Sequence, residues 1–98
     1  MEDPDDPLVA ESDVPSFDVL DKKIKEIDNL IIIYRIYYFF NSMAYRFQLL
    51  RKDKMCTIEI PRSLLEDLGR DGTSADREIS SIILLNIENE ECWKDVES

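Results

Sequence analysis

The sequence contains no histidine, and it has only two glycines and two cysteines among its 98 residues. Histidine is the commonest general base and a frequent metal ligand, so its absence removes the usual centre of a hydrolytic or zinc site. Gly69 and Gly72 alone cannot form the glycine-rich loop that cradles phosphate groups. We therefore expect a protein that is not an enzyme, with no catalytic residues, no metal and no cofactor.

The two cysteines, Cys56 and Cys92, are too few for a disulfide framework. The sequence favours two reduced thiols, and the alternative is one disulfide that ties the C-terminal end to the body of the protein. The first residues are acidic and lack the apolar stretch of a secretory signal. We accordingly expect a cytoplasmic location.

Long hydrophobic runs are also scarce. The most apolar stretch, 30–40, reads LIIIYRIYYFF and is shorter than the roughly 20 apolar residues that cross a bilayer. Extending the stretch to Leu50 brings in Asn41, Arg46 and Gln48. We therefore expect no membrane partner and a segment that is buried within a protein core.

Acidic side chains dominate, and they concentrate at the two ends of the chain. The formal net charge is −10, with no base in residues 1–15 and a single base, Lys94, in residues 88–98. This balance disfavours generic binding to nucleic acid or to acidic membranes. We predict a disordered acidic tail over 1–15, a single globular domain over 16–90 and an acidic C-terminal end over 91–98, with Trp93 docked on the domain.

An amphipathic helix is predicted over 16–29. Apolar residues recur there at helical spacing, while lysines and acids fill the opposite face. The apolar stripe consists of Phe17, Leu20, Ile24, Ile27 and Ile31. Ser16 or Asp18 can cap the first turn of this helix.

Two short segments, 44–50 and 55–60, alternate between apolar and polar residues, and the polar connection 51–54 joins them. This pattern predicts a β-hairpin. Because an isolated hairpin is only marginally stable, we expect the β-branched and aromatic stretch 30–40 to add a third strand. The alternative is a mainly α protein in which one long helix covers 16–50, since no glycine or proline interrupts that range.

Pro61 cannot donate to a strand ladder, and it suits the first turn of a helix. Helices are predicted over 62–68, which Gly69 can cap, and over 74–88, where isoleucines recur at helical spacing. A strand over 79–87 is the alternative for the last segment. The predicted fold class is α+β: a small antiparallel three-stranded sheet with one N-terminal and two C-terminal helices.

The order of the last elements is similar to that of ribbon-helix-helix repressors. Three segments carry the similarity: Cys56-Thr57-Ile58-Glu59-Ile60-Pro61, Leu64-Leu65-Glu66-Asp67-Leu68 and Thr73-Ser74. The resemblance covers 56–87, about a third of the chain. It implies, as an alternative function, a DNA-binding transcriptional regulator in which Thr57 and Glu59 face DNA and the backbone from Gly72 to Ser74 meets phosphate.

The leading functional prediction is a small acidic protein–protein interaction module: an adaptor, inhibitor or regulator without catalysis. A domain of this size buries a smaller share of its surface on folding than a larger domain does. Because 30–40 is apolar on both faces, a second copy of the chain would cover the apolar face that the domain itself leaves exposed. On a regular strand, one face would hold the predicted partner or dimer interface: Ile31, Ile33, Arg35, Tyr37 and Phe39. The hairpin tip would contact phosphate or an acidic partner through Arg51, Lys52 and Lys54.

Overall fold

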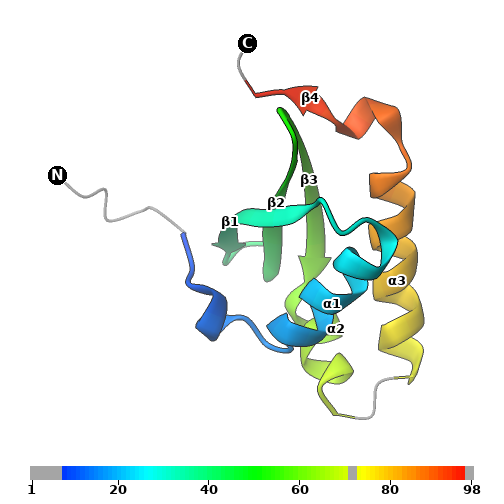
Figure 1. The fold of residues 1–98 in the computed structure, drawn as a ribbon. Coiled ribbons are helices and arrows are strands. Elements are labelled where there is room, and N and C mark those ends of the chain that lie inside the picture. The colour runs from blue at the N-terminus through cyan, green and yellow to red at the C-terminus, as the bar shows by residue number, and fades with distance from the viewer. Residues whose placement is uncertain (1–7, 71–72, 97–98) are drawn as a thin grey trace, which may run out of the picture.

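A computed structural model describes residues 8–70 and 73–96, and Figure 1 shows their arrangement. An antiparallel sheet in the order β1-β2-β3-β4 carries three α-helices on one face. The elements are η1 (Glu11–Asp13), α1 (Phe17–Ile27), β1 (Ile32–Phe39), β2 (Ala44–Arg51), β3 (Lys54–Pro61), α2 (Arg62–Leu68), α3 (Thr73–Ile87), η2 (Glu90–Cys92) and β4 (Lys94–Asp95). The predicted α+β class is confirmed. The alternatives of a helix over 16–50 and a strand over 79–87 are wrong.

Helix α1 ends at Ile27 because Asp28 redirects the chain. Asp28 has an extended backbone, and its Oδ1 accepts a hydrogen bond of 3.0 Å from the amide of Leu30. Such a local side-chain acceptor competes with the next helical hydrogen bond. The β-branched and aromatic run that follows then enters the sheet as β1 instead of continuing the helix.

Strands β2 and β3 alternate between buried and exposed side chains along most of their length, as their sequences predict. The inward-facing set is apolar and packs beneath the helices in one hydrophobic core. This core includes Leu20 and Ile24 of α1, Leu65 of α2, Ile79 and Ile83 of α3, and Phe47, Leu49, Ile58 and Ile60 of the sheet. Removal of this set from water is the main force that holds the helices on the sheet.

Strand β1 contains a β-bulge at Tyr34. Ile33 pairs with Leu49 and Arg35 pairs with Gln48, so Tyr34 is an extra residue in the ladder. An extra residue shifts the in-and-out alternation of the side chains by one position. Odd-numbered residues of β1 therefore face the core before the bulge, and even-numbered residues face it after the bulge.

This bulge corrects the prediction that Ile31, Ile33, Arg35, Tyr37 and Phe39 share one face. Ile31 is fully buried and Ile33 packs against the core. The other three lie opposite Gln48, Arg46 and Ala44, which alternate with the core positions of β2. They therefore lie on the sheet face that carries no described helix.

Residues 8–15, which belong to the disordered tail predicted over 1–15, pack against the domain. Leu8 forms a bridge with Tyr37, and the amide of Val9 donates to the carbonyl of Ile36 over 2.9 Å. Val14 is buried in the core. The acidic composition of this segment gives no sequence signal for these few contacts. Residues 1–7 lie outside the described part of the chain.

The C-terminal segment folds back across the β2–β3 hairpin. Trp93 is buried, as predicted, and its indole N–H donates to the carbonyl of Ile87 over 2.9 Å. Beyond it, Asp95 pairs with Lys54 as part of the short strand β4, which the sequence analysis did not predict. Residues 97–98 of the predicted acidic end lie outside the described residues.

Candidate functional site

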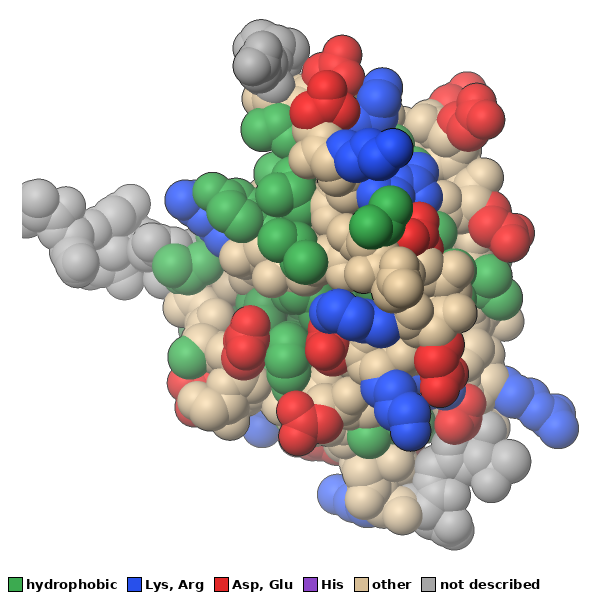
Figure 2. All heavy atoms as spheres, in the orientation of Figure 1, with side chains coloured by type: hydrophobic (Ala, Val, Ile, Leu, Met, Phe, Trp, Pro, Cys, Tyr) green, Lys and Arg blue, Asp and Glu red, His purple; other side chains and the backbone are tan. Residues whose placement is uncertain are grey.

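One face of the sheet is free of the three helices, and we call it the outer face. It consists of Ile32, Arg35, Tyr37 and Phe39 from β1, Arg46, Gln48 and Leu50 from β2, and Met55, Thr57 and Glu59 from β3. Figure 2 shows hydrophobic side chains gathered where Figure 1 draws β1 and the tip of the β2–β3 hairpin, with basic side chains beside them.

Four aliphatic side chains form a row across one end of the outer face, which we call the apolar row: Ile32, Leu50, Met55 and Val96. The strand register places Ile32 opposite Leu50 and Leu50 opposite Met55. In β4 the residue opposite Met55 is Lys94, and Val96, two residues further along the chain, lines a groove together with Met55. Ile32 is 48% exposed and Val96 is 50% exposed, so the row presents apolar surface to water.

The middle of the outer face combines arginine with aromatic rings. The guanidinium of Arg35 lies 5.1 Å from the centre of the Tyr34 ring, and that of Arg46 lies 4.3 Å from the centre of the Phe39 ring. Arg46 also forms an ion pair of 3.3 Å with Glu59 across the strands. Arginine and aromatic residues are enriched at protein interfaces, so this part of the predicted interface keeps a suitable composition.

A second surface lies at the other end of β1, and we call it the Phe40 pocket. It has a volume of about 370 Å³ and is lined by Leu8, Val9, Asp13, Tyr38, Phe40, Tyr45 and Arg62. The ring of Tyr38 lies 4.7 Å from that of Tyr45 and 4.9 Å, edge to face, from that of Phe40. Burial raises the pKa of Tyr45 above its ordinary value, so its hydroxyl stays protonated at neutral pH.

Arg62 supplies the positive charge of this pocket. Its Nε donates to Glu66 over 2.9 Å, and its Nη1 reaches the hydroxyl of Tyr38 at 3.5 Å. These contacts hold the pKa of Arg62 above its ordinary value, the contact with Tyr38 being the largest cause. The Phe40 pocket is thus an aromatic hollow with Asp13 and Arg62 both lining it.

The basic hairpin tip is engaged mainly by residues of the same chain. Arg51 forms an ion pair of 3.0 Å with Asp28, and Lys54 forms one of 3.3 Å with Asp95. Lys52 is exposed at the turn with φ of 59°. The predicted contact of Arg51, Lys52 and Lys54 with phosphate or an acidic partner stays a prediction, and at Arg51 and Lys54 such a ligand would compete with these carboxylates.

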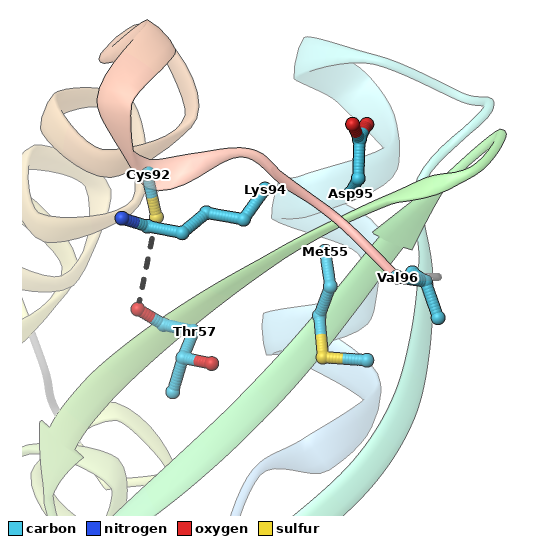
Figure 3. Close-up of a pocket in the computed structure, with 6 residues that line it drawn as sticks. All are labelled: Met55, Thr57, Cys92, Lys94, Asp95 and Val96. Atoms are coloured by element: carbon cyan, nitrogen blue, oxygen red, sulfur yellow. Dashed lines mark hydrogen bonds between the residues drawn. The ribbon is translucent and has the colours of Figure 1, made fainter. Parts of the chain in front are cut away.

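A disulfide joins Cys56 of β3 to Cys92 of η2, whose Cα atoms lie 4.9 Å apart. The prediction of two reduced thiols is therefore wrong, and the stated alternative is correct. The bond borders a groove of about 440 Å³ lined by Met55, Thr57, Cys92, Lys94, Asp95 and Val96 (Figure 3). Because disulfides persist mainly in oxidising compartments, this bond counts against the cytoplasmic location, which stays a prediction.

One polar cluster connects α1 to α3. Lys23 Nζ lies 2.6 Å from Asp76 Oδ1 and donates to Ser80 Oγ over 3.1 Å. The hydrogen bond from Lys23 holds the pKa of Asp76 below its ordinary value. The lysine is occupied by its carboxylate partner, so the cluster acts as a clamp between helices. Within the described ranges, no group of three or more acidic or cysteine side chains is placed to hold a metal ion.

The residues implied by the ribbon-helix-helix resemblance occupy different settings. Thr57 and Glu59 do project from the outer face, and Glu59 is paired with Arg46. Their strand lies between β2 and β4 in the sheet. Gly72 lies outside the described residues. DNA binding through 56–87 stays a prediction.

The sequence did not predict the Phe40 pocket, nor that the C-terminal segment adds strand β4 to the sheet. The predicted central strand includes Phe40, although the strand ends at Phe39 and Phe40 begins the turn. The polar pair Asn41-Ser42 that follows predicts the turn, but it does not indicate whether Phe40 belongs to the strand or to the turn. No local signal identified β4, because its pairing depends on residues far away in the sequence.

None of the described helices is long and apolar enough to cross a membrane. Comparisons with protein-family models, with curated proteins and with solved structures find no match to the chain.

Proposed function

We propose that this protein is a small protein–protein interaction module, without catalysis, that acts as a homodimer and binds a partner protein through its outer face. The observation that carries the proposal is the apolar row. Contiguous apolar surface that is rimmed by polar groups marks interaction sites on soluble domains. Here Ile32, Leu50 and Met55 lie opposite one another on three neighbouring strands of one sheet face, and Val96 lines a groove together with Met55.

The surroundings of the row support a protein partner. Lys94 and Asp95 border its β4 end, and Arg35 follows it along β1. An apolar centre with a charged rim is the usual anatomy of a non-obligate interface. The apolar row would provide the buried anchors, and the rim charges would set orientation and association rate.

The test compares the same substitution on the outer face and on helix α3. Leu50→Lys places a charge in the apolar row, whereas Leu85→Lys places the same charge at a position of α3 that is 72% exposed. Both proteins are used as bait in affinity capture from the native host, after circular dichroism has established that they are folded. We expect the specific partner to be lost with Leu50→Lys and kept with Leu85→Lys. Equal capture by both variants would remove the outer face from the proposal.

The homodimer is tested separately by sedimentation velocity over a wide range of protein concentrations. A dimer whose fraction rises with concentration is expected. A single monomeric species at every concentration would eliminate self-association and leave only the partner-binding half of the proposal.

A further inference from the structure

We infer that the Phe40 pocket is the contact between two copies of this chain, related by a two-fold axis. The inference rests on the homodimer in the proposed function, and it assigns the surface that the homodimer uses. The outer face is then left free for the partner protein.

The first observation is exposure. Phe40 is 80% exposed, more than any other large hydrophobic residue in the described part of the chain. Met43 is 59% exposed, and its amide donates to the carbonyl of Phe40 over 3.3 Å. Leu8, which is 52% exposed, lines the same pocket as Phe40. Interfaces favour aromatic residues and arginine, which line this pocket, and methionine, which is present in the adjoining turn as Met43.

The second observation is shape. Phe40 is 80% exposed and lines a hollow together with Tyr38 and Tyr45. A projection and a hollow on one surface fit a two-fold arrangement, because each copy then inserts its own Phe40 into the hollow of the other. Burial of a large aromatic side chain in a pocket is the commonest form of interface anchor. The arrangement closes with two copies, so it does not continue into a fibre.

The third observation is charge. Among the described residues that line the pocket, Asp13 is the acid and Arg62 is the base, and Arg62 is also paired with Glu66 of its own chain over 2.9 Å. A two-fold axis can place Asp13 of each copy against Arg62 of the other, which gives two equivalent attractive pairs. A partner of uniformly acidic surface would meet Asp13, and one of uniformly basic surface would meet Arg62. Electrostatic complementarity therefore favours a second copy over a strongly charged partner.

The first experiment measures the dimer dissociation constant by sedimentation velocity for the unsubstituted full chain, for Phe40→Glu and for Leu85→Glu. Leu85 is 72% exposed on α3 and provides the matched control. We expect Phe40→Glu to raise the dissociation constant at least about tenfold and Leu85→Glu to leave it unchanged. If Phe40→Glu dimerises as well as the unsubstituted protein, the assigned surface is wrong while the homodimer stands. If the unsubstituted protein is monomeric throughout, both are wrong.

The second experiment tests the two-fold symmetry with the single variants Asp13→Arg and Arg62→Asp. Each variant alone would bring like charges together twice in a homodimer, so each should be monomeric. An equimolar mixture should form a heterodimer, because the introduced arginine of one variant meets the introduced aspartate of the other and the native pair remains at the second contact. A mixture that stays monomeric, or single variants that dimerise normally, would overturn the inference. Thermal melts identify a variant that does not fold, and the comparison of Phe40→Glu with Leu85→Glu then decides.

Discussion

The guanidinium of Arg51 lies 4.3 Å from the centre of the Trp93 ring, and its Nη1 lies 3.0 Å from Asp28 Oδ2. One side chain therefore joins three segments: the turn after α1, the β2–β3 hairpin and the C-terminal segment. The planar guanidinium can satisfy the ring face and the carboxylate together, which a lysine ammonium cannot. The sequence predicts Arg51 as a partner contact, and the structure gives it a role in holding the fold together.

Replacing Arg51 by lysine should lower the free energy of unfolding by about 1 kcal/mol, because the charge is kept while stacking on Trp93 is lost. The measurement is urea denaturation followed by tryptophan fluorescence, which also reports the environment of the single tryptophan. Lys52→Arg, at the exposed neighbouring position, is the control and should be neutral. Equal stability of Arg51→Lys and the unsubstituted protein would show that the stacking contributes nothing.

Asp28 should make stability depend on pH in the acid range. The amide of Leu30 and the guanidinium of Arg51 hold its pKa below the usual 3.8, so the folded state binds this proton less readily than the unfolded state does. The contribution is present above the usual pKa and is lost as pH falls through the lower folded pKa. Asp28→Asn retains a side-chain acceptor for Leu30 but should flatten this part of the stability curve, measured as urea midpoints against pH. Asn29→Gln, a substitution at the exposed neighbouring position that leaves every carboxylate in place, is the control.

Removing the disulfide should lower the free energy of unfolding by about 2–4 kcal/mol, because the bond closes a loop with a sequence separation of 36 residues. The comparison uses denaturation with and without a thiol reductant, for the unsubstituted protein and for the double variant Cys56→Ala/Cys92→Ala. The reductant should weaken the first protein and have no effect on the second. Two reactive thiols per chain in the purified, unreduced protein would contradict the disulfide itself.

Deleting Tyr34 should be tolerated, at a cost of about 1 kcal/mol or less, because the extra residue leaves and the pairing of Ile33 and Arg35 with β2 continues without a bulge. Deleting Tyr37 is the matched test. This deletion would turn the side chain of Tyr38 from the core to the outer face. It should lower the free energy of unfolding by at least about 3 kcal/mol or prevent folding. Denaturation of both variants provides the measurement. If the two deletions have equal cost, the bulge is not where the register places it.

The elements that were predicted correctly are those with one clear periodicity. Helix α1 follows a stripe of apolar residues, and β2 and β3 alternate along most of their length up to Pro61. Strand β1 was predicted as a strand, but both of its sequence phases are apolar, so the alternation could not show which phase faces the core. Because of the bulge at Tyr34, the set of alternate residues that faces the core differs between the two halves of the strand. The amino-acid composition of the strand does not indicate where such a bulge lies.

The predictions that failed depend on contacts between distant residues. Cys56 and Cys92 look independent in the sequence, and they meet only because η2 returns to β3. Residues 8–15 look like a solvated tail, and they are held by the burial of Val14 and by backbone pairing with β1. The contact of Arg51 with Trp93 likewise joins residues that are distant in the sequence. Local patterns identify elements, whereas the candidate surfaces are made where elements from distant parts of the chain come together.

The return of Cys92 and Trp93 to the β2–β3 hairpin also has a consequence for biosynthesis. Cys92 is synthesised 36 residues after Cys56, so a nascent chain can form the hairpin before Cys56 has its disulfide partner and before Arg51 has the ring of Trp93. Chain growth is slow compared with the formation of a hairpin. Completion of this fold therefore waits for the synthesis of η2 and β4, and the edge of β3 that pairs with β4 stays unpaired until then.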